Sequence, residues 1–213
     1  MGNMIILGIE LVGIIAFSVS GAVVAIERGL DIFGVTLIGV LTALGGGVIR
    51  DILLGIFPPI MFTYQIYTIV SICASLYVFL IAFNDKDRFF RNIEKIDYVV
   101  NIFDAVGLGM FSVTSVQRCI SHGFEANAFL CIFMAMTTGI GGGIIRDLLC
   151  QMLPAVLKKR IYALAALSGG AVYYYMFEYG IDINLCMAAG AATTITIRLL
   201  ATKYKWNMPR VEP

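Results

Sequence analysis

Long apolar runs divide the chain into seven segments, each separated from the next by a short break of polar, glycine or proline residues. A helix that crosses a membrane needs about 20 mostly apolar residues, and each run approaches or exceeds that length. The breaks contain helix-ending residues such as Pro58, Pro59 and Gly180. The pattern therefore predicts seven spanning helices, at residues 4–26, 33–56, 60–83, 97–119, 126–152, 161–178 and 182–202.

The composition agrees with this pattern. Hydrophobic residues make up 60% of the 213 residues, charged residues only 14%, and the mean hydropathy is +0.90. A soluble domain usually carries about 25% charged residues, and one small core cannot enclose so many apolar side chains. We therefore expect an all-α, polytopic membrane protein that forms a single transmembrane domain over residues 1–213. The formal net charge of +1 gives no reason to expect a nucleic-acid partner.

The sequence also contains an internal duplication. The stretch ALGGGVIRDILLG (43–55) reappears as TGIGGGIIRDLLCQ (138–151), and upstream GIIAFSVS (13–20) reappears as GLGMFSVT (107–114). The paired landmarks are Gly45, Gly46 and Gly47 with Gly141, Gly142 and Gly143, Arg50 and Asp51 with Arg146 and Asp147, Glu10 with Asp104, and Ser18 with Ser112.

Each copy contains three predicted spans, the first at 4–83 and the second at 97–178. Because three is odd, the second copy enters the membrane from the opposite face. The sequence therefore predicts two inverted three-helix repeats, followed by a seventh helix at 182–202. In proteins of this kind, functional sites lie near the midplane, where the two halves meet.

The glycine triplets fall near the centres of the second and fifth predicted spans. Glycine lets a helix bend and frees backbone groups for other partners. Such backbone persists at membrane depth only when it is buried in protein or faces a watery cavity. We therefore expect both triplets to interrupt their helices and line a polar path. The alternative is close helix packing, which glycine also permits in membranes.

Charged residues inside spans normally face the bundle or water and find partners. The two Arg-Asp pairs therefore predict either a polar path with one charged constriction toward each side, or buried ion pairs. Adjacent residues on a helix point in different directions, so each arginine need not pair with its own neighbour. Glu10 and Asp104 are further carboxylates within spans, with Arg146 and Arg50 as candidate partners.

Two hydroxyls and the cysteines complete the candidate chemistry. Ser18 and Ser112, each after a phenylalanine, either line a path or bond back to their own helix carbonyls. The five cysteines form no CxxC pair, and the one histidine, His122, lies in a break, so we expect no metal site and no cofactor. The sequence has no HExxH or GxSxG motif, and we expect no enzymatic activity.

Basic residues are distributed unevenly between the two sides that seven spans create. Eleven of the fifteen lysines and arginines lie on one side, the other side has only Arg118, and three arginines lie within spans. The eleven are Arg28, Lys86, Arg88, Arg91, Lys95, Lys158, Lys159, Arg160, Lys203, Lys205 and Arg210. Because cytoplasmic loops carry the excess of lysine and arginine, we expect an inner (plasma) membrane protein with its N-terminus outside and its C-terminus in the cytoplasm.

The doubled GGGxxRD motif, the seven spans and the Phe-Ser step in spans one and four resemble the prokaryotic branch of the trimeric intracellular cation channel family. The resemblance covers roughly residues 5–200. It implies a homotrimer among membrane lipids, in which each subunit has its own K⁺ and Na⁺ pore lined by kinked second and fifth helices. It also implies pore kinks at both glycine triplets and a polar lining that includes Ser18, Asp51, Ser112 and Asp147.

Two further expectations follow from this resemblance. Animal members bind a phosphoinositide through a basic motif in the fourth helix, where this chain reads SVQRCISHG (115–123), so Arg118 is the one candidate there for gating or lipid contact. Bacterial sequences of this type are also described as glycine transporters. A secondary transporter of glycine or another small solute is therefore the alternative function, and Glu10 and Asp104 would be its candidate coupling sites.

Overall fold

A computed structural model describes residues 2–91, 93–158 and 161–206, and these residues form helices and connecting turns. Three of the basic residues counted for orientation, Lys159, Arg160 and Arg210, lie outside the described residues. The helices are α1 (Gly2–Glu27), α2 (Ile32–Leu53), α3 (Ile60–Thr63), α4 (Ile66–Asn84), α5 (Lys86–Arg91), α6 (Ile93–Cys119), α7 (Ala128–Leu149), α8 (Ala155–Lys158), α9 (Ile161–Glu178) and α10 (Ile183–Lys203).

The seven long helices among the described residues confirm the predicted all-α architecture, with two three-helix repeats and a further helix. Among the described residues, six helices are long and apolar enough to cross a membrane: α1, α2, α4, α7, α10 and the stretch Tyr98–Phe124 that contains most of α6. The predicted span at 161–178 is present as α9 but falls outside this set. α9 has four tyrosines and ends at a glutamate, and these residues lower its hydropathy.

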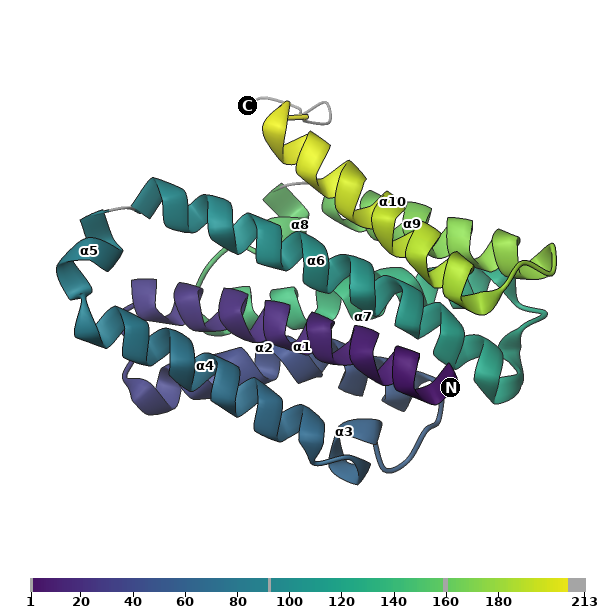
Figure 1. The fold of residues 1–213 in the computed structure, drawn as a ribbon, viewed down its shortest axis with the longest axis horizontal. Helices are drawn as coiled ribbons and strands as arrows, with labels where there is room; N and C mark the ends of the chain where they lie inside the picture. The colour runs from purple at the N-terminus through teal and green to yellow at the C-terminus, as the bar shows by residue number, and fades with distance from the viewer. Residues whose placement is uncertain (1, 92, 159–160, 207–213) are drawn as a thin grey trace.

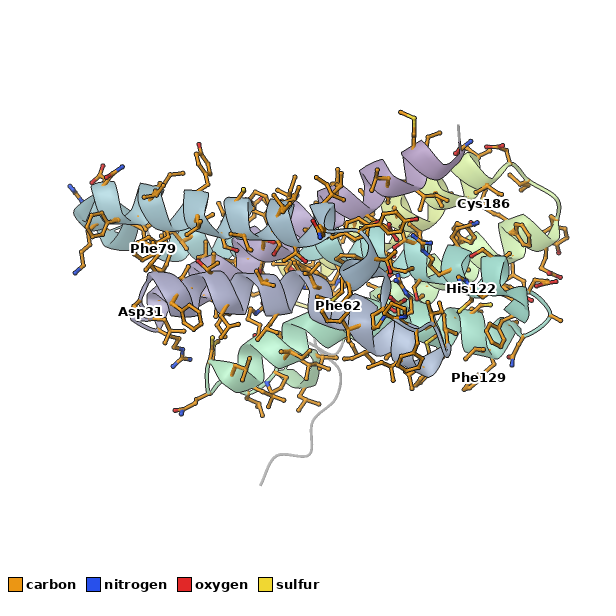
Figure 2. The ribbon with its side chains drawn as sticks, turned by 90° about the horizontal axis from the view of Figure 1, so that it is seen from below. Asp31, Phe62, Phe79, His122, Phe129 and Cys186 are labelled. Carbon is orange, nitrogen blue, oxygen red and sulfur yellow. The ribbon has the colours of Figure 1, made fainter. Side chains whose placement is uncertain are left out.

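The long helices lie side by side along the long axis of the molecule (Figure 1). Asp31 and Phe79 lie at one end of the bundle, whereas His122, Phe129 and Cys186 lie at the opposite end (Figure 2). The α1–α2 turn and the α6–α7 turn therefore face opposite ways. This is the arrangement that an inverted repeat requires.

Polar caps explain where several helices begin. The Asp31 carboxylate accepts a hydrogen bond from the Gly34 amide at α2, the Asn127 side chain accepts from Leu130 at α7, and Asp182 caps α10. These side chains satisfy amides that have no partner within the helix. Gly123, between α6 and α7, has a φ of +84°, which a residue with a side chain adopts only at a cost.

The predicted third span, 60–83, begins differently from the prediction. Residues 60–63 form the separate turn α3, and α4 begins only at Ile66, because Tyr64 adopts an extended backbone between them. In the second repeat, the short helix α8 likewise precedes the long helix α9. Phe62 of α3 lies between the two ends of the bundle (Figure 2). A short turn therefore follows each Arg-Asp motif at an intermediate depth.

The centre of the bundle is where equivalent residues of the two repeats meet. α1 packs on α6, and α2 packs on α7. Phe17 of α1 stacks on Phe111 of α6, with ring centroids 5.4 Å apart. The sequence repeat matches these two phenylalanines to each other, so their contact marks the pseudo-two-fold relation. The glycine triplets cross in the same layer of the bundle.

Candidate functional site

The two glycine triplets pack against each other where α2 crosses α7. A Cβ atom on Gly46 would collide with the carbonyl oxygen of Thr138, and a Cβ atom on Gly142 would collide with that of Thr42. A Cβ atom on Gly141 would lie 3.2 Å from the Cα atom of Gly46. The first two glycines of each triplet therefore allow the two backbones to touch.

The predicted interruption of these helices is wrong. Both α2 and α7 continue as α-helices through residues 45–47 and 141–143. Each helix keeps its own backbone hydrogen bonds, so the glycines do not expose carbonyl groups to a path. Their role in this structure is close helix packing, the alternative that the sequence left open.

The third glycine of each triplet has a different position. A Cβ atom on Gly47 would come no nearer than 3.9 Å to the Arg50 guanidinium, and one on Gly143 would lie 3.5 Å from the Tyr162 hydroxyl. Gly47 lines a small cavity with Glu10, Arg50 and Asp51. This cavity has a volume of about 30 Å³, which is roughly the space of one water molecule.

Each arginine of the duplicated motif pairs with the aspartate that follows it. The Arg50 Nη2 atom lies 2.7 Å from Asp51 Oδ1, and the Arg146 Nε atom lies 2.8 Å from Asp147 Oδ1. Adjacent residues on a helix do not have to contact each other, but in both motifs the arginine and the aspartate form an ion pair. All four side chains are at most 4% exposed.

The second oxygen of each aspartate explains this pairing. Asp51 Oδ2 accepts a hydrogen bond from the Ile60 amide at 2.9 Å, and Asp147 Oδ2 accepts one from the Ala155 amide at 2.7 Å. These amides open α3 and α8, where the first N–H groups lack helical partners. Each Arg-Asp pair therefore ties the end of one helix to the short turn that follows it.

The predicted partners of Glu10 and Asp104 are only partly correct. Arg146 Nη1 lies 2.9 Å from Asp104 Oδ1, whereas Glu10 pairs with Arg118 at 3.0 Å. Arg50 is paired with its neighbour Asp51 instead. The reason is that α1 and α6 run antiparallel. Glu10, early in α1, therefore lies beside the last turn of α6.

Two tyrosines and a serine belong to these clusters, and sequence reasoning missed them. The Tyr67 hydroxyl of α4 donates a hydrogen bond to Glu10. Ser20 receives one from Arg146 Nη1 at 2.7 Å and donates to Asp104 at 3.3 Å. Tyr162 of α9 lies beside Arg146 and Asp147. Tyr67 and Tyr162 occupy corresponding places in the two repeats. This correspondence is the feature of the sequence from which both tyrosines could have been predicted.

The structure buries both candidate serines completely. Ser18 donates to the Ser71 hydroxyl at 2.8 Å, so it connects α1 to α4. Ser112 donates to the Leu108 carbonyl of its own helix at 2.7 Å. Arg118, the candidate for gating or lipid contact, is 23% exposed and binds Glu10.

A larger polar cavity lies on the Asp104 side of the glycine crossing. Its volume is about 230 Å³, enough for several water molecules. The charged side chains that line it are Glu27, Asp104, Arg146, Asp147 and Arg198. Two polar cavities of unequal size therefore lie on either side of one tight helix crossing. The described residues contain no group of three His, Cys, Asp or Glu side chains placed to bind a metal ion.

Comparison with sequence families agrees with the duplication. A family model described as "Glycine transporter" matches the chain twice, at residues 7–82 and 101–178. The inner membrane protein YadS of Escherichia coli is 32% identical over 209 residues, which cover 97% of this chain and 96% of that protein. The Bacillus subtilis membrane protein YvgT is 38% identical over 204 residues, which cover 94% of each chain.

Solved structures with the same fold are cation channels. A prokaryotic TRIC channel crystallised in 0.5 M KCl has a TM-score of 0.86 and 35% identity, covering 97% of this chain and 100% of that one. The TRIC trimeric intracellular cation channel orthologue from Rhodobacter sphaeroides has a TM-score of 0.85 and 31% identity, covering 95% and 99%. The chain therefore belongs to the family that the "Glycine transporter" model describes, the family of the prokaryotic TRIC channels.

Proposed function

We propose that this chain is a channel for monovalent cations, K⁺ and Na⁺, in the inner membrane. The observation that carries this proposal is the pair of charged cavities on opposite sides of the crossing between α2 and α7. Each cavity contains an intramembrane carboxylate, Glu10 in one and Asp104 in the other. The similarity to TRIC cation channels supports the same function.

The path runs through each subunit, and the glycine crossing closes it in this conformation. Between the two cavities, Gly46 and Gly142 pack on the backbones of Thr138 and Thr42. A small separation of α2 from α7 opens this contact without moving a large side chain. The ions pass the paired carboxylates, which attract cations while the arginines limit that attraction. No step of this function is enzymatic, and no resident metal or cofactor is part of it.

The assembly we propose is a homotrimer embedded in membrane lipids, as the name of the Rhodobacter sphaeroides relative indicates for that protein. The orientation follows the basic residues, with the N-terminus outside and the C-terminus in the cytoplasm. The Glu10 cavity then opens toward the outside and the larger Asp104 cavity toward the cytoplasm. Each subunit has its own path because both cavities are formed within one chain.

The test is K⁺ flux without any amino acid. Purified protein in liposomes with a K⁺ gradient is expected to release K⁺ rapidly, and single-channel steps are expected in a planar bilayer. Gly46→Ala, which wedges a Cβ atom into the crossing, is expected to change the open probability. Gly8→Ala is the matched control, because a Cβ atom there has no neighbour within 4 Å. A wild-type protein without K⁺ current contradicts the channel.

A secondary transporter of glycine or another small solute is the second candidate. The description of the matching family model favours this function. The two cavities on either side of the α2–α7 crossing also favour it, because transporters with inverted repeats alternate access by rocking one repeat against the other. Uptake of radiolabelled glycine that saturates, in liposomes that pass no K⁺ alone, is the result that selects this function over the channel.

A further inference from the structure

The two carboxylate clusters are equivalent in the repeat but differ in one arginine. Glu10 is paired with Arg118, which the second repeat supplies from α6. The duplication matches Arg118 with Val24 of the first repeat, and Val24 lines the large cavity beside Asp104. An exact repeat would place an arginine at this position. The first repeat has none there.

The seventh helix, which lies outside both repeats, supplies an arginine to the same cavity. Arg198 of α10 lines it together with Asp104 and Val24. Its side chain is 2% exposed, and its guanidinium carbon lies 4.5 Å from the centre of the Tyr162 ring. The Nε atom of Arg198 is buried and has no hydrogen-bond partner. A guanidinium buried without full hydrogen bonding is costly, so its position calls for a role beyond packing.

The charges that line the Asp104 cavity indicate how Arg198 affects a cation there. Arg146 is already bound by Asp104, Asp147 and Ser20. Three carboxylates and two guanidiniums line the cavity, so the described lining groups favour a cation only slightly. Removing Arg198 alone would leave two more carboxylates than guanidiniums, and the attraction for a cation would rise.

We propose that Arg198 sets the electrostatic barrier for cations at the Asp104 end of the path, as the counterpart of Arg118, which pairs with Glu10 at the other end. The inference rests on the proposed cation channel. It gives α10 a role in conduction, although the other residues that line the cavity belong to the two inverted repeats. The two arginines come from different elements, Arg118 from α6 and Arg198 from α10, so the charge at each end can be changed separately.

The test is single-channel K⁺ current in symmetric KCl, measured in both directions. A unit charge about 6 Å from a permeant ion in water changes the local ion concentration about threefold. Arg198→Gln is therefore expected to raise the current that enters from the Asp104 end about threefold relative to the opposite direction at ~0.01 M salt. In 1 M salt, where the screening length in the solution falls to about 3 Å, the difference is expected to become smaller.

Two controls separate charge from shape. Arg198→Lys keeps the charge and is expected to keep the wild-type current ratio. Lys203→Gln removes an exposed charge from the same helix, where that lysine lies 5.6 Å from the Tyr204 ring, and is expected to change the current ratio less than Arg198→Gln does. Arg198→Met serves as a second neutral variant, and each variant is first checked for the wild-type oligomer by size-exclusion chromatography.

The outcomes distinguish this inference from the proposed function. A wild-type protein that passes no K⁺ overturns the channel and this inference with it. A conducting wild type overturns the inference alone in three cases: when neutral variants leave the current ratio unchanged, when Arg198→Lys changes it as much as Arg198→Gln, or when the difference is as large in 1 M salt as at low salt.

Discussion

Gly46 of α2 packs against the backbone carbonyl of Thr138 in α7, with no space for a side chain between them. The second repeat provides the reciprocal contact, in which Gly142 packs against the carbonyl of Thr42. The two contacts are related by the pseudo-two-fold relation of the fold. This reciprocal arrangement lets the backbones of α2 and α7 touch at their crossing.

Alanine at the middle glycine of either triplet should destabilise the fold. A Cβ atom would overlap a backbone carbonyl, and inserting an atom into a packed core typically costs about 1–3 kcal/mol. We expect Gly46→Ala and Gly142→Ala to lower the midpoint of thermal unfolding in detergent. Gly47→Ala should lower it much less, because its Cβ atom meets only the Arg50 guanidinium at 3.9 Å. Equal effects at positions 46 and 47 would contradict this account of the crossing.

The Arg50–Asp51 pair supports a second prediction. Arg50→Met leaves the buried Asp51 carboxylate without its cation, and breaking a buried pair in this way costs about 3–5 kcal/mol. The double variant Arg50→Met/Asp51→Asn removes the unpaired charge, and the asparagine oxygen can still accept from the Ile60 amide. We therefore expect the double variant to be more stable than Arg50→Met alone.

Chemical unfolding in detergent measures both free energies. Arg28→Met is the control for losing an arginine, since Arg28 lies exposed in the α1–α2 turn, and it should change stability little. A double variant that is less stable than Arg50→Met would show that the charge of Asp51 is not the source of the cost.

Much of this architecture was readable from the sequence. Apolar run length gave the long helices, and the doubled GGGxxRD motif gave the repeats, because both signals depend on local composition or on direct comparison of two stretches. The helix that follows Pro59 was placed less well. It breaks at Tyr64, after the short turn α3, whose first amide binds the Asp51 carboxylate in a tertiary contact that no local pattern reveals.

The candidate site was only partly predictable, for a related reason. Charge within an apolar span identified Glu10, Asp104 and the two Arg-Asp pairs, because such residues rarely occur there without partners. The partners themselves depend on which helices lie antiparallel, so Arg118 was assigned to gating or lipid contact and not to Glu10. The glycines were misread because a helix tolerates glycine when a neighbouring backbone packs closely against it.

Ser20 carries a third prediction. Its hydroxyl bridges Arg146 and Asp104, at 2.7 Å and 3.3 Å. Ser20→Ala leaves these buried charges with one partner fewer, which costs about 1–3 kcal/mol. The free energy of unfolding should fall by this amount. Ser168→Ala is the matched control, since Ser168 is half-buried and its hydroxyl donates to the Leu164 carbonyl of its own helix, away from any charged group. A similar loss in both variants would argue against the bridge.

The membrane orientation can be tested with single cysteines. In a background that lacks the five native cysteines, His122→Cys places a thiol in the exposed α6–α7 turn, and Lys205→Cys places one just beyond α10. The excess of basic residues puts the second position in the cytoplasm. A membrane-impermeant thiol reagent should therefore label position 122, but not position 205, on intact spheroplasts, and both after permeabilisation. The reverse pattern would turn the Asp104 cavity, and with it Arg198, toward the outside, so that Arg198 would control cation entry from the outside.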